Sequence, residues 1–134
     1  MPIILASIHP LWFISIAIVL TIASKIPVFF AMMQESGYDN NHPRQQQARL
    51  KGWGLRAVAA HQNSIEAFPF FAAGLLTGIA TGAPFNTLNI LASIFLVARV
   101  LFIYLYIADR ATIRSVVWGI GYFAAIGCAV IGLV

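Results

Sequence analysis

The sequence predicts an all-α membrane protein, a bundle of four transmembrane helices in a single domain over residues 1–134. Hydrophobic residues make up 60% of the chain and charged residues only 9%, against about 25% charged in soluble domains. The apolar residues fall into four runs, each long enough to cross the roughly 30 Å hydrocarbon core of a bilayer. The expected helices cover about 10–33, 53–80, 84–108 and 113–133, with a polar loop at 34–52.

The composition also excludes some classes of function. A pI near 9.7 is typical of nucleic-acid-binding proteins, but the eight Lys and Arg residues form no long run, and in a membrane protein such a surplus sets topology. We therefore expect no nucleic-acid partner. Cys128 has no cysteine partner, so we expect an inert, buried thiol. His9, His42 and His61 fall in separate segments, so we expect no metal site.

Two residues interrupt the apolar run of the first expected helix, 10–33. Pro27 lacks a backbone donor, so we expect a kink there. Lys25 is open to two interpretations: its side chain extends toward the headgroups, or it faces the same polar site as Glu66 of the second helix. The loop at 34–52 is dense in turn-forming residues, and we expect a solvated connector whose cations fix the orientation of the protein.

The second expected helix carries the residues around which a site is predicted: Arg56, His61, Gln62, Asn63 and Glu66. Ionisable groups inside a bilayer cost roughly 2.5–3.5 kcal/mol each, and usually face a protein interior or a polar cavity. Asn63 lies seven residues after Arg56 and three before Glu66, so these three share one helical face, and His61 points away from it. Pro69, three residues past Glu66, predicts a second kink.

The third and fourth expected helices contribute further polar residues. Arg99 and Tyr106 are seven apart and share a stripe of the third helix, unless Arg99 extends toward the headgroups. Arg114 opens the fourth helix. Gly121 and Ala125 have the small-xxx-small spacing that allows close packing within or between subunits. Most cations lie in the loops at 34–52 and 109–112, which we therefore place in the cytoplasm, with both termini on the opposite side.

Glu66 is predicted to be buried and to need a cationic partner, because an unpaired carboxylate in apolar surroundings takes up a proton. The available cations are Arg56, Arg99, Arg114 and Lys25. One carboxylate among these cations leaves a positive pocket, which suits a small anion or a thiol held as thiolate. Tyr106 would donate a hydrogen bond to the same atom. The alternative is an ion-pair network that only holds the helices together.

Two motifs are similar to those of the MAPEG family, the membrane-associated proteins of eicosanoid and glutathione metabolism. Arg56-x-x-Ala-Ala-His-x-Asn63-x-x-Glu66 resembles the family's second-helix signature, Arg-x-x-Arg-Ala-x-x-Asn-x-x-Glu. Arg99-x-x-Phe102-x-x-x-Tyr106, followed by Arg114-Ser115, is similar to the Arg and Tyr of the family's third helix and the Arg opening its fourth. The loop Asp-Asn-Asn-His-Pro-Arg resembles the bacterial branch, and the enzymes resembled are microsomal glutathione transferases.

The resemblance implies a homotrimer in a bacterial inner membrane, with glutathione as co-substrate between subunits. It implies transfer of glutathione to lipophilic electrophiles, or reduction of lipid hydroperoxides. Arg114, with Ser115, and Tyr106 would be catalytic and stabilise the thiolate. Residues implied to bind or line the ligand are Arg56, His61, Gln62, Asn63, Glu66, Arg99, Ser115 and Lys25, with His61 reaching the neighbouring subunit's ligand.

The chain departs from the family pattern at two positions. Ala59 replaces the second Arg of the helix-two motif, which removes a partner for a glutathione carboxylate, and Phe102 is unable to donate a hydrogen bond. These departures favour an alternative, a non-catalytic protein of the same fold that binds a lipid or another amphiphilic anion. A small multidrug-type transporter is a third class, disfavoured because cations outnumber the single membrane carboxylate, Glu66.

Overall fold

The computed structural model describes residues 8–134, and every regular element among them is a helix. The helices are α2 (Leu11–Ala23), α3 (Ile26–Ser36), α4 (Pro43–Arg49), α5 (Gly52–Ala80), α6 (Phe85–Ile107) and α7 (Ala111–Val130). The prediction of an all-α chain is therefore confirmed for this part of the sequence. Residues 1–7, where the predicted domain and its N-terminus begin, lie outside the described residues.

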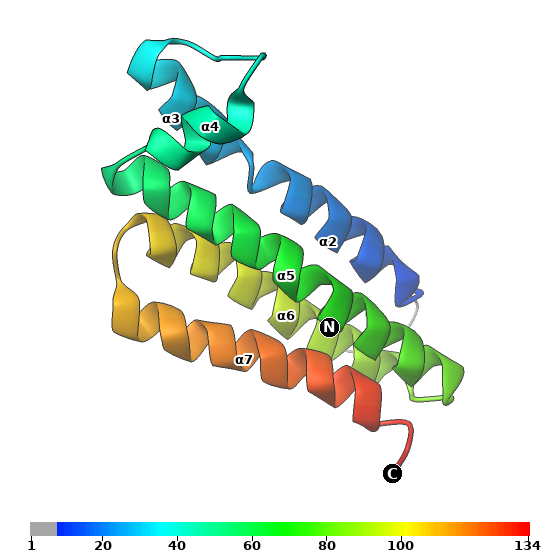
Figure 1. Cartoon of the computed structure of the whole chain (residues 1–134). Coiled ribbons are helices and arrows are strands. Elements are labelled where there is room, and N and C mark those ends of the chain that lie inside the picture. The colour runs from blue at the N-terminus through cyan, green and yellow to red at the C-terminus, as the bar shows by residue number, and fades with distance from the viewer. Residues whose placement is uncertain (1–7) are drawn as a thin grey trace.

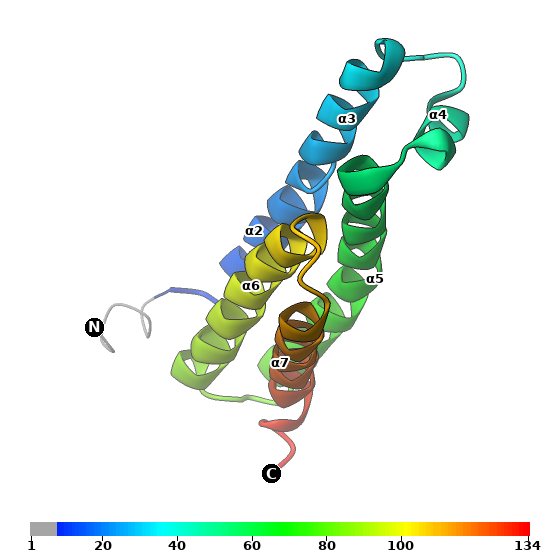
Figure 2. The same cartoon turned by 90° about the vertical axis from the view of Figure 1, so that its left-hand side faces the viewer.

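The first predicted helix is divided into α2 and α3, which follow one another in nearly the same direction (Figures 1 and 2). The break falls at Ser24 and Lys25, and Pro27 stands in the first turn of α3. A proline nitrogen has no hydrogen to donate to the carbonyl four residues earlier, here Ala23, so the helical ladder ends there. The kink predicted at Pro27 is thus confirmed as a break between two helices.

The polar loop predicted at 34–52 is shorter and more structured than expected. Helix α3 continues to Ser36, and α4 lies within the predicted loop. Gln46 of α4 is fully buried: its Nε2 donates to the carbonyls of Met32 and Gly37, and its Oε1 accepts from the backbone N–H of Asp39. Gln46 thus bonds both to the last turns of α3 and to the loop that follows it, which holds α4 against α3.

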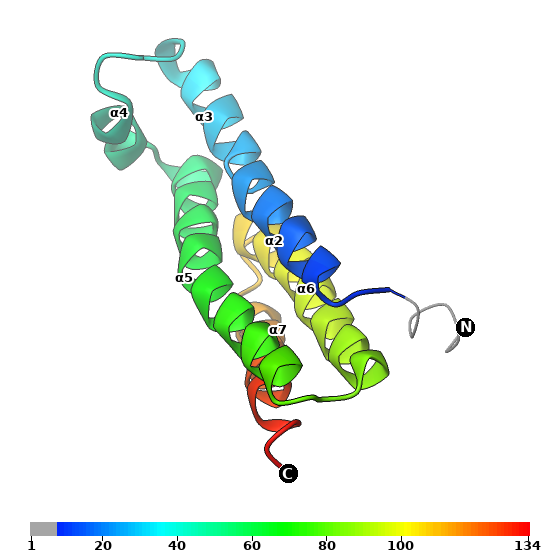
Figure 3. The same ribbon diagram turned by 90° about the vertical axis from the view of Figure 1, so that its right-hand side faces the viewer.

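Three helical segments among the described residues are long and apolar enough to cross a membrane: Leu11–Ser36, Phe85–Ile107 and Ala111–Val130. Helix α5 is longer than the last two, but the polar side chains in its first half keep it out of this group. It runs without interruption through Pro69. In the structure α5 lies along α2, α6 and α7 and packs against each of them (Figures 1 and 3).

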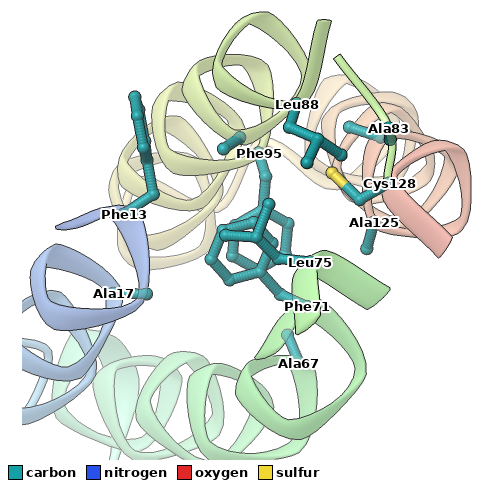
Figure 4. Packing of buried hydrophobic residues seen from close by; sticks show 12 residues of the cluster. Phe13, Ala17, Ala67, Phe71, Leu75, Ala83, Leu88, Phe95, Ala125 and Cys128 are labelled. Carbon is teal, nitrogen blue, oxygen red and sulfur yellow. The ribbon is translucent and has the colours of Figure 1, made fainter. Parts of the chain in front are cut away.

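The larger of two buried apolar clusters within residues 8–134 lies between α2, α5, α6 and α7, and the smaller one, around Val28, Met32 and Leu50, joins α3 to the start of α5. At the centre of the larger core the rings of Phe71 and Phe95 are stacked, with centroids 4.0 Å apart, and Leu88 of the same core points toward Cys128 (Figure 4). Cys128 is part of this core and is fully buried, so the expectation of a buried thiol is confirmed. The core ties α5 to the three neighbouring helices over the half of its length that follows Glu66.

Helix α7 approaches α5 closely because α5 has no side chain at Gly74 and Gly78. A Cβ atom at Gly74 would collide with the backbone carbonyl of Ala125, and one at Gly78 with that of Cys128. Gly121 instead faces Ala98 of α6. The small residues of α7 thus pack against two helices of the same chain. The small-xxx-small spacing predicted close packing either within or between subunits, and the structure shows the first.

The ends of the bundle differ in charge. The α4–α5 junction and the α6–α7 connection lie at one end, and the turn around Thr81 and the C-terminus lie at the other (Figures 1 and 3). The first end carries Arg44 and Arg49 of α4 and, in the connections, Lys51 and Arg110, whereas the turn at the other end carries no charge. Helices α3 and α4 extend past the α6–α7 connection (Figures 1 and 2).

Candidate ligand-binding site

A row of alternating cationic and aromatic groups runs along α6 toward the charged end of the bundle. The guanidinium of Arg99 lies over the ring of Phe102, 4.4 Å from its centroid. Phe102 contacts Tyr106 edge to face at 5.5 Å, and the guanidinium of Arg114, at the start of α7, lies 4.2 Å from the centroid of Tyr106. Each step is a favourable contact between a positive edge or cation and the negative face of a ring.

Arg114 lies at the accessible end of this row. Its side chain is half-buried and forms no hydrogen bond or ion pair with any residue from 8 to 134. When a guanidinium stacks on an aromatic ring, its N–H groups point outward in its own plane and remain free to donate. The group is therefore positioned to donate to an anion placed beside Tyr106.

Arg99 lies at the buried end of the same row, inside the protomer. It is only 4% exposed, and its Nη2 donates to the hydroxyl of Ser64 in α5 at 3.3 Å. Ser64 in turn donates to the carbonyl of Ala60. A small void of about 10 Å³ adjoins Arg99 and Ser64, which is room for about one water molecule. The alternative that Arg99 extends to the headgroups is wrong, because the side chain is enclosed by the bundle.

Asn63 and Glu66 form a polar edge on α5. The amide Nδ2 of Asn63 lies 3.4 Å from Oε2 of Glu66. A carboxylate only accepts hydrogen bonds, so this pairing leaves the amide oxygen of Asn63 facing away, where it is buried without a partner among the described residues. Glu66 and Gln62 are exposed on the protomer. The prediction that Glu66 is buried and paired with a cation is therefore wrong for the single chain described.

The parallel packing of α5 and α7 places this edge at the depth of Arg114. Partners across the interface differ by 50 to 52 positions: Phe70 with Tyr122, Gly74 with Ala125 and Gly78 with Cys128. Both helices rise 1.5 Å per residue, and the difference increases by one for every four residues toward their first turns. Extended in this way, it places Asn63 within about one helical turn of Arg114 and Ser115 in depth, and Glu66 near Trp118. Ser115 is exposed, and its hydroxyl donates to the carbonyl of Ala111.

Arg56 shares the predicted face of α5 but is engaged elsewhere. Its Nε donates to the carbonyl of Ile107 at 3.0 Å, and its Nη1 lies 3.8 Å from Oδ2 of Asp109. Both partners are at the end of α6, where the last carbonyls of a helix have no internal donor. Arg56 therefore holds α5 to the α6–α7 connection, and the predicted pairing with Glu66 is not formed within the protomer.

Lys25, at the start of α3, and His61 of α5 lie near each other, on the side of α5 away from Asn63 and Glu66. The Nζ of Lys25 donates to Oε1 of Gln47, and His61 Nδ1 lies 2.7 Å from the hydroxyl of Ser24. The single proton of Ser24 is directed to the carbonyl of Thr21 at 2.6 Å, so His61 Nδ1 donates and Nε2 is left as an acceptor. His61 thus faces away from Asn63 as predicted, and the alternative that placed Lys25 beside Glu66 is wrong within the protomer.

Sequence reasoning missed Ser24, Ser64 and Gln46, which are all buried and hydrogen-bonded. A serine in a membrane helix bonds to its own backbone as readily as to a neighbour, so its partner depends on how the helices are rotated. Ala59 leaves the α5 face between Arg56 and Asn63 without a polar group. Among residues 8–134 no group of His, Cys, Asp or Glu side chains has the arrangement of a metal site.

An apolar groove continues from the polar edge along α5 and α7. It has a volume of about 620 Å³ and is lined by Pro69, Phe70, Ala73, Gly74, Thr77, Tyr122, Ala125, Ile126 and Ala129. This volume falls within the range of sites for small organic molecules. Polar donors at Arg114 and an apolar groove that begins about two helical turns further along α7 together suit an amphiphilic pair of reactants.

Comparison with known proteins gives one match. A model of the MAPEG family matches residues 9–134, which is nearly the whole chain. No curated protein and no solved structure matches.

Proposed function

Because the chain belongs to the MAPEG family, we propose that it is an integral membrane glutathione-dependent transferase or peroxidase that acts on lipophilic electrophiles. The proposed site lies between copies of the chain in a homotrimer. The observation that carries the proposal is the stacking of Arg114 on Tyr106, with guanidinium donors that no residue from 8 to 134 uses and that lie within about one helical turn of Asn63 in depth.

The chemistry of the proposed site starts with the thiol of glutathione. A cation beside a thiol lowers its pKa and increases the thiolate fraction. Arg114 supplies that cation, and Tyr106 both orients it and offers its hydroxyl to the same sulfur. In transfer, the thiolate sulfur bonds to the electrophilic carbon and the leaving group departs with the bonding electron pair. In peroxide reduction, two glutathione molecules become the disulfide, while the hydroperoxide becomes an alcohol and water.

The polar edge of α5 fits the other end of the tripeptide. Glu66 accepts from the glutathione ammonium, and the buried amide oxygen of Asn63 accepts a further N–H. Gln62 and Ser115, both exposed at this level, complete the proposed lining. Arg99 is buried behind Phe102, so we assign it a positioning role: it holds Phe102, which in turn fixes Tyr106.

The homotrimer is supported by the exposure of this edge. Glu66 and Gln62 would face lipid if the chain were alone, which is costly for a carboxylate. A second copy would cover the edge with its own α2–α3 segment, bringing Lys25 and the Nε2 of His61 toward the ligand. A cation from the second copy, or Arg56 moving from Asp109, would replace the one missing at Ala59. We further propose a bacterial inner membrane location, with 34–52 and 109–112 on the cytoplasmic side.

The test is a titration of the purified protein with glutathione, followed by the ultraviolet absorbance of the thiolate. We expect a saturable thiolate signal that Arg114→Ala abolishes, because the stabilising cation is lost. Arg110→Ala is the matched control: Arg110 is exposed on the neighbouring connection and lies outside the site. Absence of thiolate and of binding at millimolar glutathione, in folded protein, would contradict the proposal.

A second candidate function is a non-catalytic protein that binds a lipid or another amphiphilic anion. It is favoured by the apolar groove of about 620 Å³ between α5 and α7 and by the missing cation at Ala59. Native mass spectrometry of the detergent-extracted protein distinguishes the two. A retained lipid that glutathione does not displace supports the second function, and a lipid-free protein that binds glutathione supports the first.

A further inference from the structure

A polar cleft of about 360 Å³ lies at the charged end of the protein, between the end of α3 and the start of α5. It is separate from the site proposed above, and no residue of that site lines it. Its lining residues are Ala31, Gln34, Glu35, Arg49, Leu50, Lys51, Trp53 and Gly54. The backbones approach closely at its base, where a Cβ on Gly54 would come within 2.9 Å of the Cβ of Ala31.

The cleft is lined by cationic and anionic side chains that form no ion pair with one another within residues 8–134. Arg49 and Lys51 lie on one wall and Glu35 on the other. Among residues 8–134 none of the three forms a hydrogen bond or an ion pair, although Arg49 acts on Asp39 at longer range. Two cations opposite one carboxylate match a ligand with a phosphate at one end and an ammonium at the other.

The cleft lies at the depth of lipid headgroups. About 20 helical residues cross the hydrocarbon core, whereas the segment Leu11–Ser36 has 26 residues. Counted from Leu11, the core ends near Phe30, so Gln34 and Glu35 reach the headgroup layer. The same conclusion follows from the way α3 extends past the α6–α7 connection (Figure 2).

The residues around the cleft are those of a membrane interface. Trp53 is 37% exposed, and Phe30 and Met33 are exposed on the neighbouring turns of α3. Indole rings favour the headgroup level because one edge is polar and the rest apolar. A soluble phosphate ester would make no use of these apolar groups, whereas the glycerol and first acyl carbons of a lipid would pack on them.

We propose that this cleft binds the headgroup of a phospholipid that carries a primary amine. Arg49 and Lys51 hold the phosphodiester, Glu35 accepts hydrogen bonds from the ammonium, and Trp53 packs against the glycerol. A quaternary ammonium has no N–H to donate to Glu35, and an anionic glycerol headgroup has no cation for it. The cleft therefore prefers the primary amine over both.

The test uses the full chain, delipidated in detergent, and native mass spectrometry with three added lipids: phosphatidylethanolamine, phosphatidylglycerol and phosphatidylcholine. We expect phosphatidylethanolamine to bind most tightly. The double variant Arg49→Gln/Lys51→Gln should weaken it about 30-fold or more, since each hydrogen bond lost from a cation to the phosphodiester costs at least about fivefold. Glu35→Gln should remove the preference for phosphatidylethanolamine over phosphatidylglycerol.

The matched control is Arg44→Gln/Arg110→Gln, which removes the same charge from exposed positions outside the cleft. Less than about a twofold loss in this control supports a specific site; an equal loss in both double variants overturns the proposal. A preference that survives Glu35→Gln also overturns it. A final arm adds water-soluble glycerophosphoethanolamine: binding as tight as that of the lipid would show a soluble phosphoester site instead and reject the lipid.

Discussion

Arg99 and Arg114 stand at the two ends of one row of rings, yet their surroundings differ. Arg99 is 4% exposed and bonded to Ser64, whereas Arg114 is half-buried with its donors unused within the described chain. Their sequence contexts gave equal reason to place both in a site. Burial separates them: the enclosed guanidinium supports its neighbours, and the open one is available to a ligand.

At the residue scale, Asp39 gives a pH-dependent prediction. Its carboxylate accepts from the backbone N–H groups of His42 and Asn41, at 3.1 and 2.9 Å. The bond from His42 is the main reason that the pKa of Asp39 lies below its ordinary value of 3.8. A lowered pKa in the folded state means that the cap stabilises the turn above pH about 4, and that this contribution is lost as pH falls through the lowered pKa.

Hydrogen exchange of the 38–42 segment measures this effect as a protection factor, the exchange rate of an unstructured peptide divided by that of the protein at the same pH. We expect the protection factors of the Asn41 and His42 amides to fall only below the ordinary pKa of Asp39. Asp39→Ala should give low protection at every pH, because the acceptor is gone. Asp39→Asn, which retains an acceptor oxygen without the charge, should give intermediate protection that does not change with pH in this range. A wild-type protection factor that does not change below pH 4 would show that the carboxylate does not hold the turn.

At the scale of elements, apolar run length was enough to locate α6 and α7 to within three residues at either end. Helix α4 was missed because it is polar on most sides, and a single buried amide, Gln46, holds it in place. The different face of His61 followed from helical periodicity alone. The hydrogen-bond partners of Lys25 and Arg56 did not follow from periodicity. They depend on how neighbouring helices are rotated, which local spacing does not determine.

The contact of α5 with α7 gives a prediction about glycine. Gly78→Ala places a methyl group against the carbonyl of Cys128 and 2.6 Å from Cδ2 of Leu88. The helices must separate to admit it, and overpacking of this kind costs about 1–3 kcal/mol. We expect a lower midpoint of unfolding, measured by circular dichroism in mixed detergent micelles.

Gly119→Ala in α7 is the matched control, because a Cβ there meets nothing within 4 Å. Helix propensity alone favours alanine by up to about 1 kcal/mol, so this variant should be neutral or slightly more stable. Equal destabilisation by the two variants would mean that the glycines matter for a reason other than the close approach of α5 to α7.

At the scale of the whole molecule, the protomer leaves its most polar helix edge uncovered. Glu66 and Gln62 are exposed on α5, and the buried acceptor of Asn63 has no donor within residues 8–134. Two explanations make opposite predictions for removing the carboxylate. If the edge faces lipid, its loss relieves a cost of roughly 2.5–3.5 kcal/mol. If a second copy and glutathione cover it, its loss removes a favourable contact.

Glu66→Leu therefore distinguishes a lone protomer from the proposed trimer. We expect the wild-type protein in native mass spectrometry to have the mass of three chains. Glu66→Leu should weaken glutathione about tenfold or more, as expected for a hydrogen bond to a charged group, without raising thermal stability. Glu35→Leu, which removes the same charge from an exposed position outside the site, should leave the glutathione affinity unchanged. If the wild-type protein is monomeric and Glu66→Leu makes it more stable, the intersubunit site is rejected. The carboxylate would then destabilise the protein in lipid, with no ligand to compensate.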